Sequence, residues 1–138
     1  MRFSAREQVG LRAMVELAQW YGSGPVPLSE VATAQEVSLA YLEQVIGALR
    51  RAGLLVSTRG ASGGYALARP PATITVGDVI RVLEGAIVPI RCVTDQSCSP
   101  CALEDRCATR SVWEIVRDRL TETLDNITLA DLRPPAQQ

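Results

Sequence analysis

The sequence predicts a mainly α-helical fold with one small β-hairpin, within a chain of 138 residues. Side chains that cap helices precede runs of apolar residues spaced three or four apart. Two short apolar runs, residues 54–58 and 64–68, enclose a turn rich in glycine and are typical of a hairpin. An apolar content of 47% and a charged content of 21% indicate a folded globular chain rather than a disordered one.

The first helix is predicted from its cap and its apolar spacing. Ser4 and Glu7 fit a capping box, in which the hydroxyl and the carboxylate satisfy amide groups at the helix start. A glycine-rich stretch at residues 22–25 then ends the helix. Between these limits the apolar positions repeat at helical spacing and comprise Val9, Ala13, Leu17 and Trp20.

Two further helices are predicted before the hairpin. Ser29 is expected to cap a short helix that ends near Gln35, and Ser38 to cap a third helix that ends near Ala52. One face of the third helix should pack on the first two and carries Leu39, Leu42, Ile46 and Leu49. The opposite face is narrow and carries Ala40, Gln44, Ala48 and Arg51, with Tyr41 beside them.

Two more helices are predicted after the hairpin. Pro70 and Pro71 end the second strand, and a fourth helix begins at Thr75 or Val76 and ends near Glu84. A longer helix spans about residues 109–126. Its apolar stripe comprises Trp113, Val116, Leu120, Leu124 and Ile127.

Three helices followed by a hairpin is the element order of a winged helix-turn-helix, so residues 1–72 are predicted to bind DNA. Small side chains would let the third helix enter the major groove, where Gln44 can pair with adenine, while Arg59 can enter a minor groove. The expected DNA-binding residues are Ser38, Ala40, Tyr41, Gln44, Arg51, Arg59, Gly60 and Gly63. Singly, each of these is also ordinary on an exposed helix face or in a tight turn, so the prediction depends on their combination and order.

All four cysteines of the chain lie between Cys92 and Cys107, and the chain has no histidine. The polar N-terminus lacks the apolar core of a secretory signal, and no apolar run is long enough to span a membrane, so we expect a cytoplasmic protein. In the cytoplasm, clustered cysteines more often bind metal or sense redox state than form disulfides. Four soft thiolates suit zinc or an iron–sulfur cluster, and their spacing lacks the two separated Cys-x2-Cys pairs of a zinc ribbon. A structural zinc site and a metal-free thiol–disulfide switch stay open as alternatives.

The stretch "SLAYLEQVIGALRRAGLLVSTRGASGGYALARP", the following "ITVGDVI" and the cysteines before the Trp113 helix resemble the IscR/NsrR family of bacterial transcription regulators. The resemblance covers nearly the whole chain. It implies a dimeric winged-helix regulator whose third helix and wing contact DNA. It also implies that the long C-terminal helix makes the dimer, with the apolar stripe of residues 113–127 at the interface.

The resemblance further implies an iron–sulfur cluster, for which Cys92, Cys98 and Cys107 match the three family cysteines best. Where some members have a histidine, this chain has Arg110, and where others borrow a carboxylate from the partner's first helix, it has Gln8. An additional thiol, Cys101, makes ligation by four cysteines of one subunit the expectation, with either a 2Fe–2S or a 4Fe–4S cluster.

The expected function is that of a DNA-binding transcription regulator, switched by this cluster in response to redox state, nitric oxide or iron–sulfur status. The expected partners are double-stranded operator DNA, a second copy of the chain, and a small oxidant or nitric oxide, but no membrane. An enzyme is not expected, because no nucleophile–base pair and no nucleotide-binding loop are visible. The expected parts are residues 1–72 for DNA binding, residues 73–132 for the cluster loop and dimerisation helix, and a flexible tail at 133–138.

Overall fold

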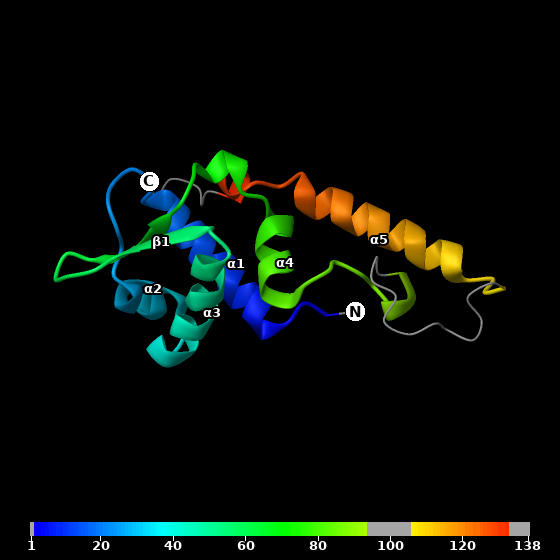
Figure 1. Ribbon diagram of the computed structural model, residues 1–138, viewed down its shortest axis with the longest axis horizontal. Coiled ribbons are helices and arrows are strands. Elements are labelled where there is room, and N and C mark those ends of the chain that lie inside the picture. The colour runs from blue at the N-terminus through cyan, green and yellow to red at the C-terminus, as the bar shows by residue number, and fades with distance from the viewer. Residues whose placement is uncertain (1, 94–105, 133–138) are drawn as a thin grey trace.

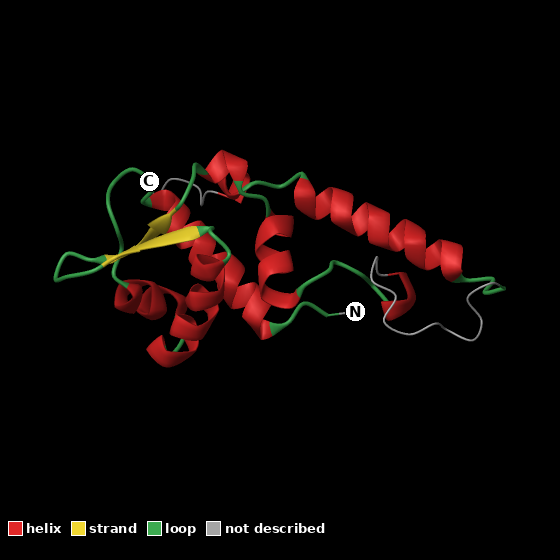
Figure 2. Cartoon of the chain, in the orientation of Figure 1, coloured by secondary structure: helices red, strands yellow, loops and turns green. Residues whose placement is uncertain are grey.

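The computed structural model describes residues 2–93 and 106–132, which form helices around one small antiparallel hairpin (Figures 1 and 2). The mainly helical fold with a β-hairpin wing is therefore confirmed. The elements of the first part are α1 (Ala5–Gln19), α2 (Leu28–Gln35), α3 (Leu39–Arg51), β1 (Leu55–Thr58) and β2 (Gly64–Leu67). Those of the second part are η1 (Pro71–Thr73), α4 (Val76–Glu84), η2 (Arg91–Val93), α5 (Arg110–Asp125) and η3 (Leu129–Leu132), where η denotes a 3-10 helix.

Helix caps decide where α1, α3 and α4 begin. The Glu7 backbone N–H donates to Ser4 Oγ at 3.1 Å and the Ser4 N–H donates to Glu7 Oε1 at 2.9 Å, which confirms the predicted capping box. Thr75 and Asp78 form a second capping box at the start of α4, whereas Ser38 caps α3 through its hydroxyl alone.

The predicted cap at Ser29 is wrong. The N-cap of α2 is Pro27, with φ at −60°, and the helix begins at Leu28. Because proline is already held near this φ, it directs the chain into the helix two residues earlier than expected. Ser29 instead lies within the first turn, where its carbonyl accepts a hydrogen bond from the Thr33 hydroxyl at 2.9 Å.

The largest core joins α1, α2, α3, the hairpin and α4. Its fully buried side chains include Met14, Leu17, Leu42, Ile46, Leu49, Leu55 and Ile74. α1 and α4 cross closely at Gly10, because a β-carbon there would overlap Leu83. Side chains on both sides of the proposed boundary at residue 72 share this core, since Val79, Leu83 and Leu129 pack into it.

The buried face of α3 differs from the predicted one at both ends. Leu39 was expected in the core but is 43% exposed, because it is the first residue of α3 and lies at the open end of the helix. Val45 is completely buried instead. Ala48, predicted on the opposite face, is half-buried and packs against the core.

The hairpin wing projects from the end of the molecule opposite to the free end of α5 (Figures 1 and 2). Its strands are antiparallel, with Leu55 opposite Leu67 and Thr58 opposite Gly64. The base of the wing is tied to the segment before α2, since Val26 and Tyr65 exchange two backbone hydrogen bonds of 2.8 Å. Gly64 is required here, because a β-carbon would overlap the backbone of Val26.

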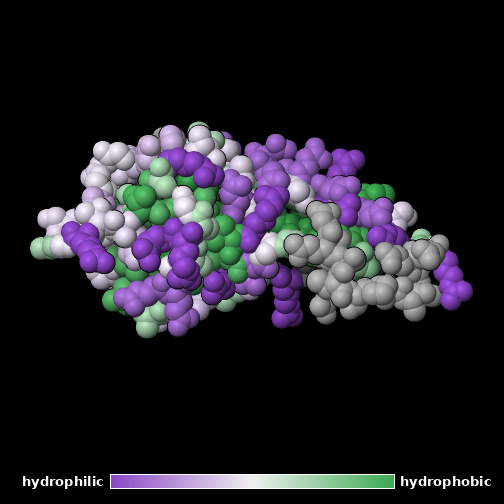
Figure 3. All heavy atoms as spheres, viewed as in Figure 1, coloured by the Kyte–Doolittle hydropathy of each residue, from purple (hydrophilic) through white to green (hydrophobic). Residues whose placement is uncertain are grey.

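α5 runs beside α4 and then extends beyond it (Figure 1). The C-terminal half of its predicted stripe packs within the protomer, where Leu120, Leu124 and Ile127 contact a second cluster formed by Val76, Ile80 and Ile87. In the N-terminal half of the stripe, Trp113 is half-buried and Val116 is 38% exposed. Beside them Val112 and Ile115, which were not predicted as part of the stripe, are exposed by 49% and 60%. Figure 3 shows apolar residues at this part of α5 among hydrophilic ones.

The chain returns from α5 to the first core through η3, an element that the sequence analysis did not predict. The Val76 N–H donates to the Ile127 carbonyl at 2.8 Å, and the Leu129 N–H to the Ile74 carbonyl at 2.9 Å. Leu129 is completely buried.

The predicted tail at 133–138 lies outside the described residues. Over the part of the chain that the structure describes, no helix has both the length and the apolar character needed to cross a bilayer.

Candidate DNA interface and cysteine segments

The N-terminal end of α3 is an exposed polar surface. The Ser38 hydroxyl accepts a hydrogen bond from the Tyr41 N–H at 3.2 Å, so it is engaged as a cap. Ala40 in the first turn and Gln44 in the second are both exposed. Gln44 therefore has the access that pairing with a base edge requires, and Ala40 adds no bulk that would hold the helix away from a groove.

Tyr41 has a more structural setting than the sequence indicated. Its side chain is half-buried and packs against the main core. The ring therefore contributes to holding α3 in place. A contact of its hydroxyl with DNA stays a prediction.

Arg51 lies back along α3 toward the preceding turn, a feature that the sequence analysis missed. A β-carbon added at Gly47 would lie 3.2 Å from Nη1 of Arg51, so the guanidinium occupies space that any other residue at position 47 would fill. Gly47 is half-buried within the helix, and Arg51 is exposed. A glycine four residues before an arginine on an exposed helix face is the signal that could have indicated this arrangement.

The wing tip combines an exposed cation with a tight turn. Arg59 and Gly60 are exposed, and Gly60 has a φ of 107°, a conformation that favours glycine. The Gly63 N–H donates to the Gly60 carbonyl at 3.0 Å. A β-carbon at Gly63 would overlap the Thr58 carbonyl, so this glycine is needed to close the turn whatever it contacts.

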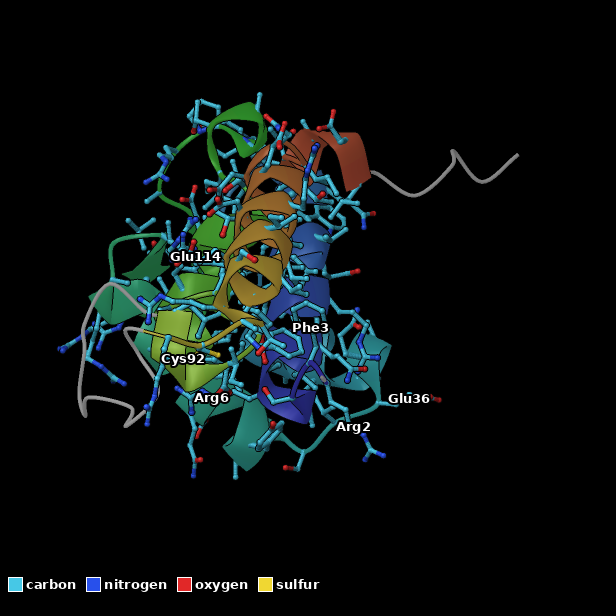
Figure 4. The ribbon with its side chains drawn as sticks, turned by 90° about the vertical axis from the view of Figure 1, so that its right-hand side faces the viewer. Arg2, Phe3, Arg6, Glu36, Cys92 and Glu114 are labelled. Atoms are coloured by element: carbon cyan, nitrogen blue, oxygen red, sulfur yellow. The ribbon has the colours of Figure 1, made fainter. Side chains whose placement is uncertain are left out.

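The structure describes two of the four predicted ligands, Cys92 and Cys107. Both are half-buried free thiols. Cys92 lies in η2, and Cys107 lies just before Thr109, the N-cap of α5. Figure 4 looks onto the end of the molecule to which α5 extends and shows Cys92 at this end. Cys98 and Cys101 lie outside the described residues.

Cys107 has surroundings that favour its thiolate. Its Sγ lies 3.3 Å from Oγ1 of Thr109. This side-chain hydrogen bond, together with backbone hydrogen bonds and the charge of Arg110, lowers the pKa of the Cys107 thiol. The thiolate is the form that binds soft metals and attacks disulfides.

Cys92 is held near α5 by its neighbour Val93. The Val93 side chain is 1% exposed, and its carbonyl accepts a hydrogen bond from Nη1 of Arg117 at 2.8 Å. Arg117 belongs to α5, which also follows directly after Cys107. The two described thiols are thus both anchored to the first half of the same helix.

These donors fit the predicted cluster in their chemistry. Two free thiols border the intervening segment, and soft sulfur ligands suit an iron–sulfur cluster or zinc. Within residues 2–93 and 106–132, no group of three or more cysteine, aspartate or glutamate side chains is placed to hold a metal ion.

Two named regulators resemble the chain over most of its length. It is 44% identical over 132 residues to the HTH-type transcriptional regulator CymR of Bacillus subtilis, which covers 96% of this chain and 89% of CymR. It is 39% identical over 132 residues to the HTH-type transcriptional regulator IscR of Cronobacter sakazakii, covering 96% and 80% of the two chains. These relatives are transcriptional regulators and not enzymes, as the sequence analysis predicted for this chain.

Solved structures and a family model agree with these relatives. The structure of B. subtilis CymR, described as the global cysteine regulator of that organism, matches with a TM-score of 0.80 and 43% identity, over 96% of this chain and 95% of the other. IscR of T. potens matches with a TM-score of 0.77 and 45% identity, over 96% and 85%. The model of the Rrf2 family, described as iron-dependent transcriptional regulators, matches residues 3–134. The chain belongs to the Rrf2 family of transcriptional regulators.

Proposed function

We propose that this regulator is a cytoplasmic homodimer that binds operator DNA, with an affinity controlled by an iron–sulfur cluster on Cys92, Cys98, Cys101 and Cys107. The observation that carries the proposal is that Cys92 and Cys107 are both anchored to α5, the helix that packs on α4. The likeness to IscR and the iron-dependent description of the family support the cluster. When bound, the cluster supplies a centre that oxidants or nitric oxide can modify.

The DNA surface in this proposal is the exposed face of α3 together with the wing. Gln44 would read a base edge in the major groove, and Arg51 and Arg59 would contact phosphate or a minor groove. Ser38, Ala40, Tyr41, Gly60 and Gly63 would allow or assist the close approach of the backbone. Their exposure supports this assignment for Ser38, Ala40 and Gly60, whereas Tyr41 and Gly63 also have the structural roles described above.

The dimer surface in this proposal is the N-terminal half of α5, which keeps Trp113 and Val116 of the predicted stripe and adds Val112 and Ile115, because Leu120, Leu124 and Ile127 pack within the protomer. Val112, Ile115 and Val116 lie on neighbouring positions of one helix and are all more than a third exposed. Contiguous apolar side chains on an extended helix are typical of a surface covered by a partner. A second copy packed about a twofold axis would cover this surface and place the two wings on one operator.

The route from the cysteines to DNA would pass through helix packing. Ligation of Cys92 and Cys107 would hold η2 against the start of α5, and α5 contacts α4 through Leu120 and Leu124. α4 in turn packs on α1 at Gly10. Loss of ligation would change the geometry between α5 and the DNA-binding helices, and coupling of about 1–3 kcal/mol would suffice for a switch.

The decisive test is anaerobic purification followed by a visible absorption spectrum and analysis for iron, sulfide and zinc. A brown protein with iron and sulfide in near-equal amounts, whose operator affinity changes when the cluster is removed, is the expected result. A colourless protein without iron after anaerobic reconstitution would refute the cluster. The matched variant is Cys107→Ser, which should fold but fail to retain the full cluster.

A second candidate is a thiol–disulfide switch or structural zinc site in the same winged-helix regulator. It is favoured by the likeness to CymR, the global cysteine regulator of B. subtilis, and by the lowered pKa of the Cys107 thiol. Iron-free protein containing zinc would indicate the structural site. Iron-free and zinc-free protein whose operator affinity changes on oxidation and recovers on reduction would indicate the thiol switch.

A further inference from the structure

We propose that Arg117 is the positioning residue that holds Cys92 for its role in the cysteine site. The inference rests on the proposed function only in taking Cys92 as a functional thiol. Arg117 does not itself touch the sulfur. It acts on the backbone of Val93, the residue that follows Cys92 in η2.

The guanidinium of Arg117 makes two directed contacts. Its Nη1 donates to the Val93 carbonyl at 2.8 Å, and its Nε donates to Oδ1 of Asp118 at 3.0 Å. The side chain of Arg117 is 29% exposed, whereas that of Asp118 is 68% exposed. Because Nε is engaged by a carboxylate, the planar guanidinium is oriented with Nη1 toward the carbonyl.

A cleft lies beside the hydrogen bond between Arg117 and the Val93 carbonyl. It has a volume of about 560 Å³ and is bordered by Ile87, Val88 and Val93 on one side and by Arg117 and Thr121 of α5 on the other. Side chains therefore do not fill the space between η2 and α5 here. The buried Val93 side chain and the hydrogen bond from Arg117 are two of the contacts that keep η2 against the helix.

Loss of the guanidinium should loosen η2 without displacing α4 or α5. In Arg117→Gln, the shorter neutral side chain would not reach Val93 in the same geometry, so that carbonyl would lose a charged donor. The Cys92 thiol would then sample more positions and become more accessible. Cys107 should be less affected, because its hydrogen bond to Thr109 does not involve Arg117.

The test uses two independent readouts on the full chain. The first is the rate at which N-ethylmaleimide alkylates Cys92 in the reduced, metal-free protein, followed by peptide mass spectrometry with Cys107 as the internal reference. The second is the lifetime of the visible absorption of anaerobically reconstituted protein after exposure to air. Arg119→Gln is the matched control, because it removes the same charge from an exposed position of α5.

In Arg117→Gln we expect alkylation of Cys92 to accelerate about fivefold to tenfold relative to Cys107, and the cluster lifetime to shorten by a similar factor. Arg117→Lys, which keeps the charge and one donor, should lie between this variant and the wild type. Arg119→Gln should match the wild type in both readouts. Circular dichroism and thermal unfolding would verify that the variants are folded. If Arg117→Gln does not fold, Arg117→Lys is compared with the wild type instead.

The inference is overturned if Cys92 reacts at the wild-type rate in both Arg117 variants, or if Arg119→Gln gives the same acceleration as Arg117→Gln. The latter result would assign the effect to charge alone. Failure of the proposed function would look different. Wild-type protein that assembles no cluster, combined with faster alkylation of Cys92 in Arg117→Gln, would refute the cluster and uphold the positioning role.

Discussion

Arg81 of α4 and Asp125 of α5 form a two-point ion pair across the contact between their helices, with Nη1–Oδ1 and Nη2–Oδ2 distances of 2.8 and 2.6 Å. The hydrogen bond between them raises the pKa of Arg81 and lowers the pKa of Asp125, so both shifts favour the charged pair. Arg81 also lies 4.0 Å from Asp78, the residue that completes the cap of α4. The pair thus joins the last turn of α4 to the end of α5.

Replacing Asp125 with alanine should destabilise the fold by about 0.5–1 kcal/mol, because the pair is two-pointed but more than a third exposed on both sides. A double-mutant cycle with Arg81→Ala, measured by urea unfolding, isolates the coupling between the two side chains. Glu122→Ala, at an exposed acidic position of the same helix, is the control. A coupling free energy indistinguishable from zero would mean that the pair does not help to hold α5 on α4.

The same pair predicts a dependence of stability on pH. Because the folded-state pKa of Asp125 is lowered, the stabilisation is fully present above the unfolded value of about 3.9 and is lost as the pH falls through the folded pKa. The difference in free energy of unfolding between wild type and Asp125→Asn should therefore be constant from pH 7 to about pH 4 and shrink below it. Asp131, whose pKa is lowered by Thr128, titrates in both proteins and cancels. A difference that persists unchanged to pH 2 would contradict this account.

The substitution Gly77→Ala also tests the contact between Arg81 and Asp125, because its effect on the free energy of unfolding should change sign when Asp125 is removed. A β-carbon at this position would overlap the carboxylate of Asp125, so Gly77→Ala should displace that carboxylate from Arg81 and lower the free energy of unfolding by about 1 kcal/mol. In an Asp125→Ala background the carboxylate is gone and only the flexible end of Arg81, whose Nη1 lies 3.1 Å from the added β-carbon, has to shift. Alanine should then stabilise the helix by about 0.5 kcal/mol. Thermal unfolding of the four proteins checks this. Destabilisation of equal size in both backgrounds would place the conflict elsewhere.

Local signals in the sequence predicted the parts of the fold that depend on neighbouring residues. The capping box at Ser4 and the cap at Ser38 placed two helix starts correctly, because the bonds that cap a helix are made within a few residues. Leu39, by contrast, was predicted in the core and is exposed. Helical periodicity identifies a face of α3, but it does not tell where along the axis the neighbouring helices end.

Long-range contacts could not be predicted in this way. The bridge between Val26 and Tyr65 and the return of Leu129 to the core depend on how distant segments meet. The hold of Arg117 on Val93 joins positions 24 residues apart, and an arginine on an exposed helix gives no sign of it. The cysteines were visible as a group at once, but the anchoring of two of them to α5 required the fold.

The wing prediction can be tested at Arg59. Arg59→Ala should weaken operator binding about fivefold to thirtyfold and reduce the slope of log affinity against log salt by about 1, if the guanidinium contacts phosphate or a minor groove. The fold should be unaffected, because Arg59 is exposed at the hairpin tip. Fluorescence anisotropy with labelled operator at several salt concentrations measures both quantities. Arg119→Ala, on the distant α5, is the control for a general loss of charge.

The final prediction separates stability from DNA binding at Gly47. Gly47→Ala should raise the free energy of unfolding by about 0.5–1 kcal/mol, because glycine is unfavourable inside a helix. It should nevertheless weaken operator binding by about threefold to tenfold, because the new β-carbon approaches Nη1 of Arg51 to 3.2 Å and moves the guanidinium off the face of α3. Urea unfolding and anisotropy titrations on the same samples give the two values.

The control is the same change in an Arg51→Ala background, where no guanidinium occupies the space beside position 47. There Gly47→Ala should still stabilise α3 but should leave operator affinity unchanged. An equal loss of affinity in both backgrounds would mean that the methyl group itself obstructs the DNA, and that the placement of Arg51 is irrelevant to binding. Because a stabilising substitution cannot weaken binding through partial unfolding, a loss confined to the Arg51 background assigns a role in recognition to the space that Gly47 leaves open.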